Sequence, residues 1–232
     1  MKKKVNNIRF LPFCSRFVLT LSHNNQSTIT NMKKQLNKII AGVSVALALY
    51  GCANQTTSFD EIVANRRSVR SYDKTQKVSE EQVRTLIATT QEAPSWANVQ
   101  ATRYYVVMSE EKLNEVLPSM LANQEKASTA PVLIVTTYKQ NQSGFFNGEA
   151  ANEAGNSWGA YDAGLSNAFL VLKAKEMGFD TLIMGLRDAD GLKKALGIPS
   201  DETVMTVVAL GYGNQVPKRP DRKPLDEIMK IK

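Results

Sequence analysis

Three arginines and two serines lie close together between Arg66 and Ser71. Arginine presents a planar fork of donors that matches the oxygens of a phosphate. The hydroxyls of Ser68 and Ser71 offer neutral donors to the same oxygens. The cluster therefore favours a phosphorylated ligand, and a solvated basic helix end is the alternative that the cluster alone leaves open.

The distribution of charge argues against a nucleic-acid partner. The formal net charge is +7, from 29 Lys and Arg against 22 Asp and Glu. Residues 1–52 carry eight of the basic residues and none of the acidic ones, which leaves a net charge of −1 for 53–232. The folded part is nearly neutral, so no general electrostatic footprint for nucleic acid remains.

Histidine and cysteine are missing from residue 53 onward, because the chain holds only His23, Cys14 and Cys52. This excludes a Cys/His zinc site, a disulfide framework, a cysteine nucleophile and a Ser-His-Asp triad in that part. We expect no metal site. An enzyme built on 53–232 must use carboxylates, Lys, Arg or Tyr, or else a bound cofactor.

The N-terminal part has the features of a signal peptide. Lys33, Lys34 and Lys38 give it a basic start, and 39–50 is an apolar run of 12 residues, too short for a membrane span. Leu-Tyr-Gly-Cys at its end resembles the lipobox of bacterial lipoproteins, in which the cysteine, here Cys52, is acylated and becomes the mature N-terminus. A buried core helix is the alternative interpretation of the apolar run.

These features divide the chain into four segments. We expect an upstream extension at 1–31, a lipoprotein signal peptide at 32–51, a tether at 52–57 and a folded domain at 58–232. The protein would then be a membrane-anchored lipoprotein of the bacterial envelope. Ala rather than Asp follows the cysteine, which favours the outer membrane in an organism with two membranes.

Helix and strand signals beyond the tether predict an α+β domain. Capping boxes at Ser58 and Ser79 open two helices, the first through Asn65 and the second stopping before Pro94. We further expect strands at 104–108, 131–138, 181–184 and 203–210, helices at 110–124 (kinked or split at Pro118), 152–177 and 188–196, a polar loop at 139–148, and a helical turn in the tail. Strands and helices without strict alternation favour α+β.

The helix at 152–177 is apolar nearly all round, so we expect it to be central or buried against another subunit. Gly155, Gly159 and Ala163 recur at four-residue spacing. We predict that this ridge of small residues lets a second copy of the chain approach closely.

Five ordered features resemble the nitroreductase family of FMN-dependent oxidoreductases. They are Arg66-Arg67-Ser68-Val69-Arg70; Ala93-Pro94-Ser95 with Asn98 and Gln100; the small-residue helix; Met177-Gly178-Phe179-Asp180 leading to Met184-Gly185-Leu186; and Gly211-Tyr212-Gly213 before a basic, proline-rich tail. The resemblance covers 59–232. It implies an α+β fold with a mixed or antiparallel central sheet flanked by helices, and a homodimer whose subunits embrace each other around FMN at their interface.

The resemblance also implies a cofactor site. The residues it assigns to FMN are Arg66, Arg67, Ser68 and Arg70 for the phosphate, ribityl chain and ring edge, Pro94, Ser95, Asn98 and Gln100 for the ribityl hydroxyls and ring carbonyls, Gly185 and Leu186 for the isoalloxazine, and Arg219 and Arg222 for the phosphate. Loop capping and an ordinary strand-to-helix turn are the alternatives for the second and third groups. Trp96 and Trp158 either line the substrate face or belong to the core.

The predicted activity is hydride transfer from NAD(P)H, through FMN, to an electrophilic acceptor such as a nitroaromatic, a quinone or an activated alkene. No catalytic side chain is assigned, because flavin N5 itself accepts and gives hydride. Flavin destruction and dehalogenation are rival activities. A non-catalytic surface lipoprotein that binds flavin or another ligand on the same fold is the alternative, favoured by the scarcity of nicotinamide cofactors outside the cytoplasm.

Overall fold

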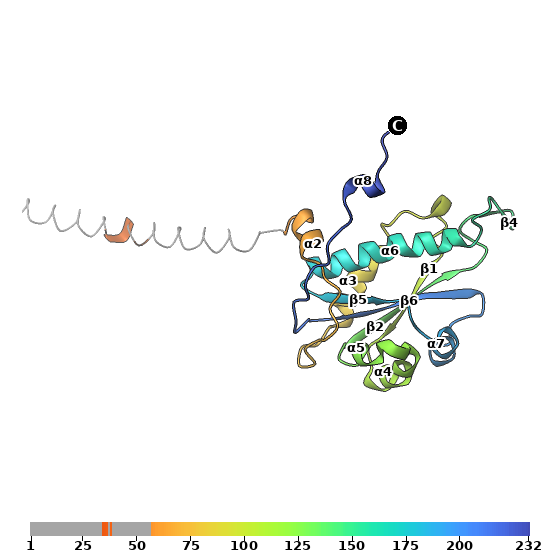
Figure 1. Ribbon diagram of the computed structural model, residues 1–232. Helices are drawn as coiled ribbons and strands as arrows, with labels where there is room; N and C mark the ends of the chain where they lie inside the picture. The colour runs from red at the N-terminus through yellow and green to blue at the C-terminus, as the bar shows by residue number, and fades with distance from the viewer. Residues whose placement is uncertain (1–33, 37, 39–56) are drawn as a thin grey trace, which may run out of the picture. The chain divides into compact units, whose positions relative to one another are not determined.

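The computed structural model of this chain describes residues 34–36, 38 and 57–232 (Figure 1). The expected extension at 1–31, the apolar run of the signal peptide and Cys52 lie outside these residues. No helix within the described ranges is both long enough and apolar enough to cross a membrane.

Four antiparallel strands form the central sheet of the domain, in the order β1-β2-β6-β5. The strands are β1 (Thr102–Val107), β2 (Val132–Lys139), β5 (Asp180–Met184) and β6 (Glu202–Gly211). Strand β2 is buried from Val132 to Tyr138, as expected of a central strand covered on both faces. Strands β1 and β5 are the two edge strands, so residues next to β1 and residues next to β5 lie at opposite edges of the sheet.

Helices cover both faces of the sheet (Figure 1). Helices α3 (Glu80–Thr90) and α6 (Ser157–Glu176) pack on one face, around Leu86, Ile134 and Leu170. The opposite face is covered by α4 (Glu110–Val116), the 3₁₀ segment η2 (Leu117–Asn123), α5 (Gln124–Ala127) and α7 (Ala189–Leu196). The remaining elements are α2 (Phe59–Asn65), η1 (Trp96–Asn98), the hairpin β3 (Phe145–Phe146) and β4 (Glu149–Ala150), and α8 (Leu225–Ile228).

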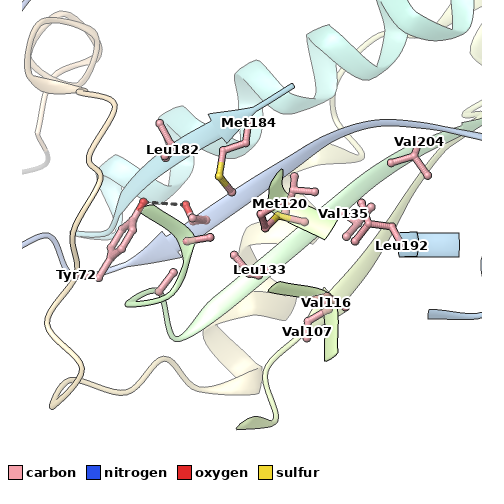
Figure 2. Close-up of a cluster of buried hydrophobic side chains, with 14 of the residues drawn as sticks. Tyr72, Val107, Val116, Met120, Leu133, Val135, Leu182, Met184, Leu192 and Val204 are labelled. Carbon is pink, nitrogen blue, oxygen red and sulfur yellow. Dashed lines mark hydrogen bonds between the residues drawn. The ribbon is translucent and has the colours of Figure 1, made fainter. Parts of the chain in front are cut away.

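Figure 2 shows the core on the second face. Tyr72 lies at one side of this apolar cluster, which also contains Leu133 and Met184. Its buried hydroxyl donates to the carbonyls of Val69 at 2.9 Å and Ala209 at 3.3 Å. Burial raises the pKa of Tyr72 strongly, and the charge of Asp180 adds to the effect. This tyrosine therefore anchors the segment that follows α2 to the sheet.

The predicted α+β class and the sheet flanked by helices are confirmed. Both capping boxes form, since Ser58 pairs with Glu61 and Ser79 with Gln82. The segment around Pro118 is split into α4, η2 and α5, as the proline predicts.

Two expectations about local structure are wrong. The long helix begins at Ser157 rather than 152, because the Asn152 side chain accepts the N–H of Ala154 in a turn that competes with the helix. Part of the expected polar loop forms the β3–β4 hairpin, in which Phe145 pairs with Ala150. Gly148, at φ 84°, supplies the left-handed conformation that this tight connection needs.

The ridge of small residues on α6 faces the chain's own sheet. A Cβ on Gly159 would lie 2.3 Å from the ring of Tyr138, so the glycine is required by the packing of α6 on β2. Ala163 is buried in the same way, and Gly155 precedes the helix. The prediction that this ridge meets a second copy is therefore wrong.

Candidate functional site

The predicted arginines come from two segments, one before the first strand of the sheet and one after the last. The structure brings both segments to one hollow of about 140 Å³. Residues after α2 and residues of the tail line it together: Arg66, Arg67, Ser68, Arg70, Pro217, Lys218, Arg219, Pro220 and Arg222. Within the described part of the chain, none of these six basic side chains has a carboxylate oxygen within 4.0 Å. The positive charge of this arginine hollow is thus left for an anion to neutralise.

The three arginines after α2 are not equivalent. Arg67 turns back on the helix and donates to the carbonyls of Ala64 and Arg66, where a cation is favourable at a helix C-terminus. Arg70 is exposed and makes one such bond, to the carbonyl of Ser68 at 3.0 Å. Arg67 is therefore partly committed to the helix end, whereas Arg66 and Arg70 keep more donors for a ligand.

Backbone bridges hold the segment after α2 in place. Ser68 pairs with Thr181 of β5, and the N–H of Val69 donates to the Thr181 carbonyl at 3.0 Å. Tyr72 pairs with Gly213, just beyond β6. The amide of Gln215, turned so that its oxygen faces the chain, accepts the N–H groups of Arg70 and Ser71. These bridges bring the tail to the arginines.

The far end of β5 carries the predicted Gly185 and Leu186. Leu186 is 56% exposed, and its carbonyl accepts a bond from the Asn123 side chain at 3.0 Å. A Cβ on Gly185 would meet nothing within 4 Å, so the described chain leaves open space there. Gly185 is four positions along the chain from Thr181, which places the open position roughly 13 Å along the edge from the bridge to Ser68.

The loop 94–100 carries the third group of predicted residues. Asn98 and Gln100 are exposed, and the Gln100 amide donates to the Asn98 side-chain oxygen at 3.2 Å. The Gln100 N–H donates to the hydroxyl of Ser95 at 3.1 Å. Pro94 is exposed at the start of the loop.

Ser95 and Gln100 line a separate hollow of about 270 Å³, together with Thr90, Tyr104 and Ser166. The Tyr104 hydroxyl is buried without a hydrogen-bond partner in the described chain, and burial raises the pKa of Tyr104. This hollow is polar but contains none of the predicted arginines. A larger hollow of about 890 Å³, between α3, β1, α4 and α7, contains none of the predicted site residues.

The predicted residues therefore form two regions rather than one site within a single chain. The arginine hollow and Gly185 lie along β5, at one edge of the sheet. The loop 94–100 leads into β1, at the opposite edge. Among the described residues, no group of three or more His, Cys, Asp or Glu is placed to hold a metal ion.

The nitroreductase family model matches residues 63–212, which span all four strands of the sheet. This chain belongs to the nitroreductase family.

Curated relatives in the family match over most of their own length. YdgI of Bacillus subtilis, named as a candidate NAD(P)H nitroreductase, is 24% identical over 207 residues, covering 77% of this chain and 99% of the relative. RSc1004 of Ralstonia nicotianae, named as a candidate NADH dehydrogenase/NAD(P)H nitroreductase, is 28% identical over 170 residues, covering 66% and 86%.

Solved nitroreductase-like structures show the same fold. A crystal structure from Exiguobacterium sibiricum, determined in complex with FMN, has a TM-score of 0.69 and 24% identity, covering 76% of this chain and 98% of that one. The NADPH:FMN oxidoreductase of Vibrio harveyi, complexed with NAD⁺, has a TM-score of 0.62 and 24% identity, covering 75% and 76%.

Two features of the site were not predicted from the sequence: which of the tail cations enter the hollow, and the role of one buried carboxylate. The tail holds four neighbouring cations, and the fold brings Lys218, Arg219 and Arg222 into the hollow, while Lys223 pairs with Glu227 at 3.6 Å. Asp162, buried beside the loop 94–100, was not predicted. Its signal was present, because it is the one charged residue in the stretch 157–172 of α6.

Proposed function

We propose that this chain is an FMN-dependent oxidoreductase that takes hydride from NAD(P)H and passes it to a small electrophilic acceptor such as a nitroaromatic or a quinone. The observation that carries the proposal is the arginine hollow. Six cations without a carboxylate partner in the described chain surround a space of about 140 Å³, at the end of a sheet edge whose other end is open at Gly185.

The residues along β5 fit the shape and charge of FMN. Its phosphate would be held by Arg66, Arg70 and the tail cations through charge-assisted hydrogen bonds. The edge of β5 would carry the extended ribityl chain, and the missing side chain at Gly185 leaves room for a flat ring against the backbone. When bound, FMN supplies a ring whose N5 accepts and gives hydride.

The chemistry of the remaining residues agrees with a cofactor enzyme. The domain has neither histidine nor cysteine, so a cysteine nucleophile and histidine acid–base catalysis are excluded. The chain's part is to bind the cofactor, orient it and shape the substrate space, with protons taken from water. The FMN and NAD⁺ complexes of the similar structures, and the NAD(P)H nitroreductase names of the relatives, support the same cofactor pair here.

We propose further that the protein works as a homodimer. The loop 94–100 lies at the β1 edge, so Asn98 and Gln100 reach the β5 edge most simply from a second copy. The outward face of α6 offers a surface for that copy. It is apolar and partly or fully exposed, and consists of Tyr161, Gly164, Leu165, Ala168 and Phe169.

The exposed tail supports an embracing dimer. Leu225, Ile228 and Ile231 are all more than half exposed, although they are large and apolar. Such side chains on one short segment are characteristic of a surface that another chain covers. The small residues Gly164 and Ala168 on α6, rather than Gly159, are the positions where two backbones would come close.

The lipobox-like Leu-Tyr-Gly-Cys supports a location at a membrane surface of the bacterial envelope, with Cys52 acylated. This same feature favours the second candidate function, a surface lipoprotein that binds flavin without turning it over. Comparing the full-length chain with Cys52→Ser after membrane fractionation tests the anchor. Two soluble proteins that begin before residue 52 would contradict it.

The visible spectrum of the purified full-length chain tests the function. We expect bound FMN to give a yellow protein whose flavin absorbance bleaches when NAD(P)H is added without an acceptor, and returns when a quinone is added. A yellow protein that no donor bleaches would establish the binding function instead. A colourless protein that takes up no added FMN would contradict both.

A further inference from the structure

The loop 94–100 has a strained backbone. Ala97, Asn98 and Gln100 have φ values of 42°, 56° and 50°, in the left-handed region that L residues rarely adopt. Such conformations persist only when the surrounding structure fixes them, and they occur often at functional sites. Something outside the loop must therefore hold it.

The buried carboxylate of Asp162 on α6 makes the contact that can do this. Asp162 is 2% exposed, and both of its oxygens accept the backbone N–H of Trp96, at 3.0 and 3.2 Å. One of these oxygens also accepts the hydroxyl of Ser143 at 2.6 Å, from the segment before the β3–β4 hairpin. In the described chain no Lys, Arg or His nitrogen lies within 4.0 Å of this carboxylate, so neutral donors alone satisfy it.

This contact lies where it can fix the conformation of the loop. Trp96 immediately precedes Ala97, the first residue with positive φ, so fixing its N–H fixes the direction in which the chain enters the strained stretch. The ring of Trp96 packs against Trp158 of α6, with centroids 4.7 Å apart. Carboxylate and indole thus hold one residue from two sides.

The held conformation determines what the loop presents. The bond between Asn98 and Gln100 uses the oxygen of one amide and the nitrogen of the other. The Asn98 nitrogen and the Gln100 oxygen keep their hydrogen-bonding capacity at the surface. A donor and an acceptor at fixed positions suit a flat heterocycle with both kinds of group on its edge.

We propose that Asp162 is a positioning residue for flavin binding, which holds the loop 94–100 so that Asn98 and Gln100 are preset to contact the cofactor. The role rests on the proposed function. It differs from a structural role because it acts on cofactor affinity through the shape of one loop. Asp162 acts through its contact with Trp96, which transmits the position of the carboxylate to the loop.

The experiment compares Asp162→Asn with Ser143→Ala in the full-length protein. Trp96 and Trp158 are the two tryptophans of the chain, so the paired-indole signal in circular dichroism reports on the contact between this loop and α6. FMN affinity is measured by titrating the apo-protein, and melting of the apo-protein measures stability. We expect Asp162→Asn to weaken FMN binding about tenfold or more and to lose the indole signal. Ser143→Ala, which keeps the Trp96 contact, should stay within about twofold of wild type.

Three outcomes would overturn the proposal. Asp162→Asn that loses the indole signal but keeps the wild-type FMN affinity would show that the loop position is irrelevant to flavin. Equal losses in both variants, in proportion to their melting temperatures, would show a structural role only. A wild-type chain that binds no FMN would remove the proposed function as well, so the two failures are distinguishable.

Hydrogen exchange provides a second test that holds even where Asp162→Asn does not fold. In the wild-type protein the Trp96 N–H should exchange slowly, and FMN should slow it further. Fast exchange of this amide in the FMN complex would overturn the proposal.

Discussion

The arginine hollow and the loop 94–100 are the two halves of the proposed cofactor site, and they are built differently. The hollow gathers like charges on well-paired backbone, bridged to β5 at Thr181 and to the tail at Gly213. The loop has no charged residue and a strained backbone, which one buried carboxylate of α6 holds. The hollow is defined by its unpaired positive charge and the loop by its backbone conformation. Changes of charge should therefore affect the first, and changes of backbone freedom the second.

Removing charge from the hollow should have the largest direct effect on FMN binding. Arg66→Ala or Arg70→Ala should weaken FMN binding by about 1.5–3 kcal/mol, and the double variant by about 3 kcal/mol or more, because each arginine offers hydrogen bonds to a charged group. Lys223→Ala is the matched control, since Lys223 pairs with Glu227 and does not line the hollow. Titration of the apo-proteins with FMN measures this. An unchanged dissociation constant in both single variants contradicts the assignment.

A charge on the outward face of α6 should separate the two halves without touching either. Ala168→Glu should place an unpaired carboxylate in the proposed interface, which costs about 3–5 kcal/mol of dimer stability. Light scattering should then detect a monomer, and the monomer should lose most of its flavin. Glu176→Lys, at the exposed end of the same helix, is the control. A dimeric, yellow Ala168→Glu protein would place the interface elsewhere.

High pH should lower the stability of the domain through Tyr72, which anchors the segment that carries the arginines after α2. Burial raises the pKa of Tyr72 above its unfolded value of about 10, so its contribution is complete below that pH. It declines as pH rises further, because the unfolded tyrosine then loses its proton and the folded one keeps it. Tyr72→Phe should lower stability by about 1–3 kcal/mol near neutral pH. It should also reduce the alkaline decline in urea midpoints. An unchanged decline would mean that other tyrosines with a raised pKa, such as Tyr104, cause it.

Relieving strain in the loop should have the smallest effect. Ala97→Gly removes a left-handed penalty of about 1–2 kcal/mol and adds chain entropy of about 0.5–1 kcal/mol. We expect a gain of up to about 1 kcal/mol in the free energy of unfolding. Ala88→Gly, in the exposed interior of α3, should instead lose about 1 kcal/mol. Equal losses at both positions would indicate that the loop is not strained at Ala97.

Most of the fold could be predicted because its signals are local. The serines at 58 and 79 cap helices wherever those helices pack, and the short apolar run of β2, rich in β-branched residues, favours a buried strand. The start of α6 was misplaced because Asn152 competes for the backbone through its own side chain. The hairpin was missed because two-residue strands carry almost no periodic pattern.

The site was predictable only in part, because its assembly depends on the order of strands. The arginines after α2 and those in the tail were assigned to one phosphate site, and they line one hollow. The loop 94–100 was assigned to the same cofactor at a subunit interface. Its place at the β1 edge, opposite to β5 in its own sheet, depends on strand order, which sequence spacing does not reveal. Whether these residues contact FMN, and whether Cys52 is acylated, remain predictions.

The arginine hollow has a consequence for the biosynthesis of the protein. Lys218, Arg219 and Arg222 are translated after every strand of the sheet, whereas Arg66 and Arg70 are translated before the first. A polypeptide released before residue 218 could still form the sheet and its two cores, yet it would have only half of the cations. Cofactor loading would then distinguish finished polypeptides from prematurely terminated ones, even where both fold.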